Sequence, residues 1–333
     1  MRHFLYILVL LLLGSSCKRD HLYYGVTDKA LLGVNIDWAP SQMTPNGATV
    51  VAYNDDGSLY EEFPYFSNPN RGIIALPVGR YTLVVYNNTP GEYRHLSFRE
   101  AFSQNTYRAS AIDKEKPLRG FIGLSNSIPT IVEDPEMLAS ARTMGVSVTR
   151  DMVEYYYDRP AGPSHEVVSE ITLTPARVIT LVHVKAHVMG LCYAAGAPVT
   201  HLRNLSGDYY LGQGCNSARG VTHEFILNNR VFDPGTTRNG TISHTFNSFG
   251  LITDGSLRAN TRYFLDIDFR LVDGRIHPLS FDVTDLIHSK QGLTTCLTVE
   301  VNITLPEAIG GDGDGAFDTD VEPWDDVHVD IPM

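Results

Sequence analysis

The chain has 333 residues, of which 43% are hydrophobic, and this is enough apolar material for two domains of ordinary size. The formal net charge of −12 is unevenly placed, because nine acids and no lysine or arginine fall in the last 27 residues. The other 29 acids nearly balance the 26 bases. A neutral body with an acidic tail argues against nucleic acid as a partner, since phosphate contacts need clustered lysine and arginine.

The first seventeen residues predict export and attachment to a membrane. Arg2 and His3 are followed by an apolar run over 4–13 and by small residues before Cys17. The run is shorter than the roughly twenty residues of a membrane-spanning helix, so it indicates a secretory signal. We expect lipid attachment at Cys17, which would then be the first mature residue. An ordinary cleaved signal with an incidental cysteine is the alternative.

Strand patterns begin after a short polar tether at 18–29. Apolar and polar residues alternate, which is the period of a strand with one buried face. Asp56-Gly57 is a hairpin turn signal, and Pro77-Val78-Gly79 suits a tight connection between strands. In this half the strands are predicted at residues 32–38, 48–53, 59–63, 72–76 and 80–86.

The middle of the chain interrupts the strand pattern. Asp134 looks like a helix N-cap, with Pro135 and Glu136 in the first turn and Gly145 as a stop, so a helix is predicted over Pro135–Met144. The tyrosines at 155–157 favour a strand. Two prolines and a glycine within 158–163 predict a boundary between domains.

Strand patterns resume after this boundary. In the run Val178–Met189, valines at alternate positions share one face, and His183, Lys185 and His187 share the other. Asp273-Gly274 marks a second hairpin. The other strands are predicted at residues 167–173, 209–211, 222–227, 241–249, 263–272, 276–283 and 295–305.

Short strands with turn chemistry between them indicate an all-β protein, with an antiparallel sandwich in each half and few short helices. The predicted divisions are a signal at 1–17, a tether at 18–29, an N-terminal β-sandwich domain at 30–160, a C-terminal β-sandwich domain at 164–306 and an acidic tail at 307–333.

The tail combines a Gly/Asp-rich linker with a terminal apolar pattern. The glycines and aspartates of 310–315 cannot bury themselves, whereas Val327, Val329 and Ile331 alternate as in a strand and are expected to dock on a sheet. Asp312, Asp314 and Asp318 have ligand chemistry for calcium. Their spacing misses the calcium-loop pattern and Pro323 stands where the closing glutamate is needed, so a solvated linker is favoured.

Three cysteines remain besides Cys17. One disulfide, from Cys192 to Cys215, is permitted in an exported protein. The alternative is that Cys192, Cys215 and Cys296 are buried thiols packed as small apolar groups.

Nothing in the sequence predicts a catalytic site, a metal or a cofactor. His183 and His187 lie about 13 Å apart along a strand at about 3.3 Å per residue, too far to share one ion directly. Nucleophile elbows, phosphate loops and zinc motifs are missing from the sequence. The seventeen tyrosines leave a glycan-binding face as an alternative use of the sandwiches.

Several stretches resemble the fimbrillin-like lipoproteins of Bacteroidota, a family classed as a domain of unknown function. They are the start Cys17–Tyr24, the strand Ala30–Trp38, the Leu-Pro-Val-Gly-Arg-Tyr element from Leu76 and the ending from Asp320 to Pro332. The resemblance implies two transthyretin-like Greek-key sandwiches, outer-membrane lipidation at the cell surface and a role in adhesion related to type V pili.

In such pili, shaft subunits lose their first strand when a protease cuts after an arginine, and a neighbour donates the strand that fills the groove. This chain has no arginine between Arg19 and Arg71, which favours a subunit that stays anchored. The two hypotheses are a non-enzymatic lipid-anchored protein of pilus assembly, anchoring or adhesion, with pilus subunits as partners, and a surface glycan-binding lipoprotein. Val327, Val329 and Ile331 are the candidate donor or closing strand.

Overall fold

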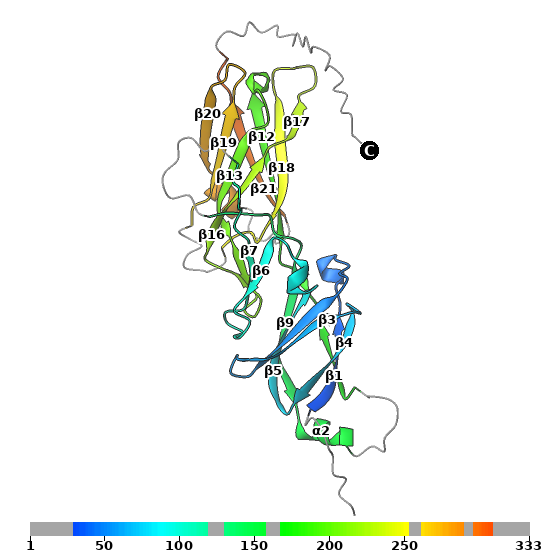
Figure 1. Ribbon diagram of the computed structural model, residues 1–333. Coiled ribbons are helices and arrows are strands. Elements are labelled where there is room, and N and C mark those ends of the chain that lie inside the picture. The colour runs from blue at the N-terminus through cyan, green and yellow to red at the C-terminus, as the bar shows by residue number, and fades with distance from the viewer. Residues whose placement is uncertain (1–28, 119–129, 158–166, 253–260, 290–295, 309–333) are drawn as a thin grey trace, which may run out of the picture.

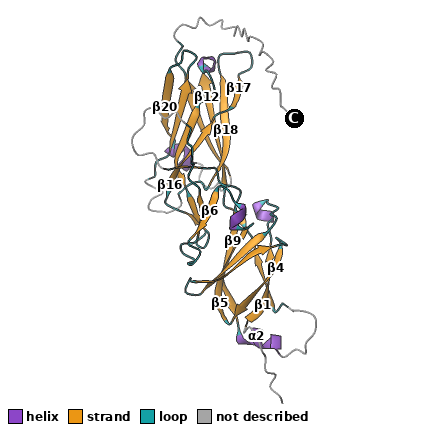
Figure 2. Ribbon diagram, viewed as in Figure 1, coloured by secondary structure: helices purple, strands orange, loops and turns teal. Residues whose placement is uncertain are grey.

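The computed structural model describes residues 29–118, 130–157, 167–252, 261–289 and 296–308 (Figure 1). Within these ranges the chain is mostly β strand, with two short α-helices and three single 3-10 turns (Figure 2). Two β-sandwiches follow one another end to end (Figure 1), so the predicted all-β fold is confirmed.

The N-terminal sandwich packs a three-stranded sheet, in the order β10-β1-β4, against a five-stranded sheet, in the order β11-β9-β5-β2-β3. The apolar alternation predicted for the first strand puts Leu32, Val34 and Ile36 into the core. The predicted Asp56-Gly57 hairpin joins β2 and β3. The strands are β1 Lys29–Ile36, β2 Ala48–Asn54, β3 Leu59–Phe66, β4 Arg71–Pro77, β5 Gly79–Asn87, β9 Ala139–Val148, β10 Ser169–Leu173 and β11 Ala176–Arg177.

The N-terminal sandwich also takes in chain from beyond the predicted boundary. The boundary at 158–163 lies outside the described residues. The next two strands were predicted as part of the C-terminal domain, but they pair with strands of the N-terminal sandwich. β10 lies parallel to β1, and β11 lies antiparallel to β9. How the chain divides into domains therefore stays a prediction, and the strand pairing of the N-terminal sandwich extends to Arg177.

The C-terminal sandwich packs a four-stranded sheet, β17-β18-β12-β21, against a five-stranded sheet, β20-β19-β13-β16-β8. Val182, Val184, Ala186 and Val188 of β12 are buried, as the alternation predicts. The Asp273-Gly274 turn joins β19 to β20. The strands are β8 Ile131–Val132, β12 Thr180–Met189, β13 Val199–Ser206, β16 Gly220–Ile226, β17 Asn229–Phe232, β18 Gly240–Ser248, β19 Phe264–Arg270, β20 Ile276–Asp282 and β21 Cys296–Thr304.

A fifth sheet joins the two sandwiches, and we call it the junction sheet. Its order is β15-β14-β7-β6, so strands from the first half of the chain pair with strands from the second half. The junction sheet consists of β6 Leu96–Arg99, β7 Arg108–Ala111, β14 Asp208–Tyr210 and β15 Cys215–Asn216.

Three strand pairs in the described part of the chain are parallel, which the antiparallel pattern of the sequence did not indicate. They are β1 with β10, β12 with β21, and β16 with β8. Each joins strands far apart in sequence, so no local turn signal marks it. The remaining short elements are η1 Ala39–Ser41, η2 Pro90–Glu92, η3 Leu191–Tyr193, α2 Arg150–Tyr157 and α4 Thr284–Ser289.

Two local predictions are wrong. The helix predicted over Pro135–Met144 is absent, because β9 occupies Ala139–Val148 and pairs with β5. The strand predicted at 155–157 is the end of helix α2. In the first case the acids that look like helix caps serve other elements, as described below.

Three apolar cores follow one another along the molecule. One lies within each sandwich, and the third lies at the junction, where Tyr53 and Tyr86 of the N-terminal sandwich meet Tyr107, Val221 and Phe249. No helix among the described residues is long and apolar enough to span a membrane.

The described chain begins and ends at opposite poles (Figure 1). Lys29 starts β1 at the end of the N-terminal sandwich that faces away from the junction. β21 runs parallel to β12, and Leu305 donates a backbone hydrogen bond to Met189 at the end of β12. Ala308 therefore lies near the far end of the C-terminal sandwich, which we call the far pole.

Candidate functional site: the junction between the sandwiches

Several predicted site residues lie outside the described residues. These are the lipidation site Cys17, the terminal strand residues Val327, Val329 and Ile331, and the acids Asp312, Asp314 and Asp318.

The cysteines Cys192, Cys215 and Cys296 are thiols, and no disulfide joins any two of the described residues. The suggested bridge from Cys192 to Cys215 is therefore not formed. Cys192 follows the end of β12 at the far pole, whereas Asn216, next to Cys215, donates to the carbonyl of Phe249 at the junction. The ten residues of β12 separate the two ends by roughly 30 Å.

His183 and His187 lie on the exposed face of β12, as the alternation predicts. His183 Nδ1 is 2.9 Å from Thr245 Oγ1, and His187 Nε2 is 2.6 Å from Glu300 Oε1. Each histidine thus has its own partner. No group of three or more histidine, cysteine, aspartate or glutamate residues in the described part of the chain could hold a metal ion.

Most of the described tyrosines pack in the interior. Among the tyrosine side chains that the structure describes, six are buried and four are half-buried, so none of these ten stands fully exposed as a ring for binding glycans. Tyr86 and Tyr107 share a hydrogen bond of 2.8 Å between their hydroxyls, and Tyr86 stacks on Phe98 with ring centroids 4.9 Å apart. Burial raises the pKa of Tyr53, Tyr86 and Tyr107 above the ordinary value, so they remain neutral.

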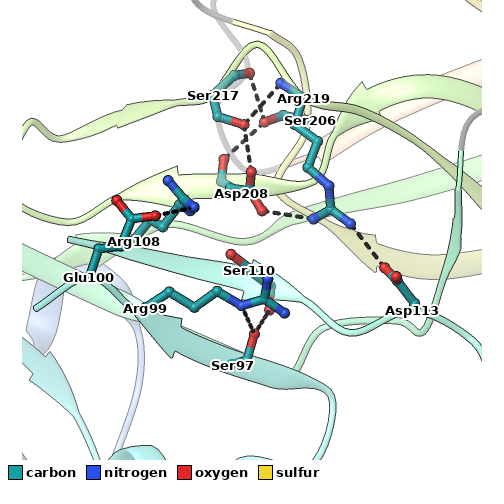
Figure 3. A network of polar contacts seen from close by, with 10 residues as sticks. All are labelled: Ser97, Arg99, Glu100, Arg108, Ser110, Asp113, Ser206, Asp208, Ser217 and Arg219. Carbon is teal, nitrogen blue, oxygen red and sulfur yellow. Dashed lines mark hydrogen bonds and ion pairs between the residues drawn. The ribbon is translucent and has the colours of Figure 1, made fainter. Parts of the chain in front are cut away.

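A polar network lies beside this aromatic core, on the junction sheet (Figure 3). Arg219 bridges two halves of the chain: Nη1 donates to Asp208 Oδ1 at 2.8 Å and Nη2 to Asp113 Oδ1 at 2.9 Å. Ser217 Oγ also donates to Asp208, at 3.1 Å. Arg108 pairs with Glu100 at 2.5 Å. Buried Asp208 therefore has the partners that a charge needs away from water.

A second buried network lies on the outer face of the five-stranded C-terminal sheet. Glu224 accepts hydrogen bonds from Leu118 N at 2.7 Å and pairs with Lys114 Nζ at 3.1 Å. Its other oxygen lies 3.2 Å from His201 Nε2. Strand register places His201 opposite Glu224 on one side and Asp266 on the other. Segment 113–118 is thus tied to this sandwich through Glu224, through the ion pair of Asp113 with Arg219, and through the hydrogen bond that Lys114 N donates to the Ile131 carbonyl at 2.9 Å.

Asp266 has partners of its own in this network. Its carboxylate pairs with Arg203 at 2.6 Å and accepts a hydrogen bond from Ser280 at 2.6 Å. Burial lowers the pKa of His201 against the opposing effect of Glu224, so the imidazole is held in its neutral form by its surroundings.

The acids that looked like helix caps also bind across the junction. Glu136 accepts backbone hydrogen bonds from Arg94 at 2.6 Å and His95 at 2.9 Å, just before β6. Asp134 Oδ1 lies 3.4 Å from Nδ1 of the buried His223, and Asn247 donates to the carbonyl of Pro135 at 3.1 Å. Extended backbone, rather than a helix, lets these three neighbours reach different elements.

Together the aromatic core, the junction sheet and the two buried networks make a fixed connection between the sandwiches. The polar groups satisfy one another across strands that are about 100 residues apart, as in the pairing of β7 with β14. Such a set of contacts orients two bodies relative to one another. The one sequence signal for this connection is the pair of acids at 134 and 136.

The fold, two β-sandwiches joined by a small sheet, is similar to that of a solved candidate adhesin from Bacteroides ovatus. The chain belongs to the family described as Domain of unknown function (DUF5119), whose model matches residues 16–225. This agrees with the family resemblance of the sequence. A comparison with curated proteins finds no match.

Solved structures with a similar fold include a candidate adhesin from Bacteroides ovatus, with a TM-score of 0.53, 18% identity and coverage of 88% of this chain and 98% of that one. The fimbrial anchor protein Mfa2 from Porphyromonas gingivalis has a TM-score of 0.48 at 13% identity, covering 83% of this chain and 90% of its own. Polysaccharide-binding candidates from Bacteroides thetaiotaomicron reach a TM-score of 0.46 at 10% identity, covering 84% and 92%.

Proposed function

We propose that this is a non-enzymatic, lipid-anchored protein of the outer-membrane surface that acts in pilus assembly, pilus anchoring or adhesion. Cys17 is the proposed lipid attachment site. Pilus subunits, bound by strand donation, are the proposed partners.

The place of β1 is the observation that carries this proposal. β1 is the middle strand of its sheet, paired with β4 from Lys29 to Asn35 and with β10 from Leu32 to Ile36. Its side chains Leu32, Val34 and Ile36 fill the N-terminal core. Loss of this strand would open that core, and no arginine precedes it after Arg19. A first strand that stays in place keeps the body joined to Cys17.

The positions of the chain ends support an anchoring role. A lipid on Cys17 would lie twelve residues before Lys29, at the pole where β1 begins. The far pole, where Ala308 lies, would then point away from the membrane. This arrangement suits a stalk that presents its C-terminal end to partners.

The proposed strand role of the tail is supported by an open sheet edge. β17 is an edge strand, and all four of its residues are exposed, including Val231 at 57% and Phe232 at 40%. Edge strands offer unpaired backbone donors and acceptors to another strand. We propose that Val327, Val329 and Ile331 form the donor or closing strand.

The test combines two variants in the native host. Cys17→Ser should move the protein from the outer membrane to the soluble fraction. Metabolic labelling with an alkyne fatty acid should mark the parent protein and not the Cys17→Ser variant. Affinity capture from outer membranes should recover pilus subunits, and deletion of 312–333 should abolish that capture while far-UV circular dichroism shows the body still folded. Recovery of glycan-import proteins alone would contradict the proposal.

A further inference from the structure

Three arginines from separate elements surround η3 at the far pole. Arg230 of β17 donates from Nη2 to the carbonyl of Leu191 at 2.7 Å. Arg238, between β17 and β18, lies over the Tyr193 ring with its guanidinium carbon 5.5 Å from the centroid. Arg275 belongs to the turn between β19 and β20. We call Arg230, Arg238 and Arg275 the far-pole arginines.

Two far-pole arginines already hold the first acid of the tail. Glu307 Oε1 accepts from Arg238 Nη2 at 2.7 Å and from the Tyr193 hydroxyl at 3.3 Å. The backbone carbonyl of Glu307 accepts from Arg275 Nη2 at 3.0 Å. Directly after its last described strand, the chain is therefore bound by two arginine side chains.

The far pole keeps unused positive charge. Arg275 pairs with Asp273 of its own turn at 2.6 Å, and Asp233 is the other acid in the neighbouring loops. Arg230 donates only to carbonyl oxygens and makes no ion pair with a carboxylate of the described chain. Arg270, at the end of β19, is exposed and likewise has no acid partner within the described ranges.

The rest of the tail has the complementary chemistry. Residues 312–330 contain eight acids and no lysine or arginine. The same stretch includes Phe317 and Trp324, and the far-pole arginines already lie over aromatic rings, since Arg230 is 4.8 Å from the Phe232 centroid. Guanidinium groups attract both carboxylates and aromatic faces.

We propose that the acidic stretch 312–326 of the tail binds the far-pole arginines of its own chain. Single exposed ion pairs contribute only about 0.2–1 kcal/mol, but several on one tether act together at an effective concentration of about millimolar. Asp312 is five residues beyond Glu307, so extended chain brings it within about 17 Å. The binding depends neither on the lipid nor on a strand role for 327–331.

Intrinsic fluorescence tests this inference in the full chain. The protein has two tryptophans, and Trp38 is only 4% exposed, so acrylamide quenching reports mainly on Trp324. We expect Trp324 to be protected at low salt. Its quenching constant should rise about twofold or more when the Debye length falls from about 30 Å at 0.01 M salt to about 3 Å at 1 M. A triple variant, with Arg230→Ser, Arg238→Ser and Arg275→Ser, should show the high quenching constant of Trp324 at any salt concentration.

The matched control is Arg71→Ser with Arg80→Ser and Arg262→Ser, which removes three exposed ion-paired arginines away from the far pole. This control variant should have the same quenching constant as the parent protein at each salt concentration. Arg238→Ser with Arg275→Ser, which leaves the carbonyl contacts of Arg230 intact, should also expose Trp324. Equal quenching in parent and far-pole variants would overturn the inference. Protection that grows with protein concentration would overturn it as well, because the tail would then bind a second copy.

Discussion

At the scale of single residues, Glu224 is one of the groups that hold the segment after β7 on the C-terminal sandwich, together with Arg219 and the carbonyl of Ile131. Its side chain is fully buried and meets a lysine, a backbone amide and a histidine. A buried carboxylate is tolerated only when such donors surround it, because the cost of desolvation is otherwise several kcal/mol. Lys114 supplies the compensating charge from the first half of the chain, so this ion pair also joins the segment after β7 to β16.

His201 makes this region sensitive to pH. Burial lowers the pKa of His201 in the folded protein, whereas the unfolded chain takes up a proton as the pH falls through about 6.5. Below that pH the unfolded state therefore binds more protons. Folding should lose up to about 1.4 kcal/mol per pH unit as the pH falls from about 6.5 toward the folded pKa. Urea unfolding at a series of pH values measures this slope.

His201→Gln should remove that contribution, so its curve of unfolding free energy against pH should be flatter than the parent curve. Glu224, Asp266 and Lys114 face the imidazole and are unchanged in the variant. His183→Gln, on the exposed face of β12, is the control and should keep the parent slope. Parallel curves for parent and His201→Gln would show that another group titrates.

At the scale of elements, β12 and β13 explain what the sequence could predict. Apolar and polar residues alternate along β12 because one face of the strand meets the core and the other meets solvent. This alternation made the strand predictable from the sequence. β13 was missed, although it is a central strand. Its outer face carries His201 and Arg203, which pair with Glu224 and Asp266 of the neighbouring strands, so a buried polar residue lies on one side and buried Leu202 and Leu205 on the other. A polar residue no longer predicts an exposed position when partners on neighbouring strands satisfy it in the interior.

Of the junction sheet only β14 was predicted, as the strand at 209–211, and its partners were missed for a related reason. β6, β7, β14 and β15 have two to four residues each, too few for a reliable period. Their pairing depends on contacts that no local pattern records. The wrong helix at 135–144 has the same origin, because the donors that bind Glu136 come from residues 94 and 95. The hairpins and long strands, which depend on local turns and alternation, were predictable.

Asp208→Asn should weaken the junction. The change keeps the size of the side chain but removes the charge that Arg219 and Ser217 bind. Since the Asp208 side chain is only 7% exposed, we expect a loss of about 1–3 kcal/mol in unfolding free energy. Chemical denaturation measures it. Asp55→Asn, which removes an exposed ion pair with Arg80, should change stability by less than about 0.5 kcal/mol. Equal losses would mean that the network does not hold the junction.

At the scale of the whole molecule, the strand order suits a load along the long axis. β1 enters at one pole between two partner strands, and β21 leaves at the other pole along β12, with nine residue pairs in register. No disulfide joins the described residues, so among them only noncovalent contacts resist the separation of paired strands under tension. A pull on both ends runs along these strands. The ladder hydrogen bonds, which lie across the strands, are then loaded together rather than one after another.

Single-molecule pulling tests this mechanical arrangement. With handles at the two termini, β21 is sheared along β12, and we expect a high rupture force. With handles at the C-terminus and at Thr237, both at the far pole, the pull peels β21 away from Thr304 onward and breaks the same bonds in sequence. The rupture force should then be markedly lower at the same loading rate, because forced unfolding follows the unfolding barrier rather than equilibrium stability. Equal forces in the two geometries would show that β21 does not resist the load by shear.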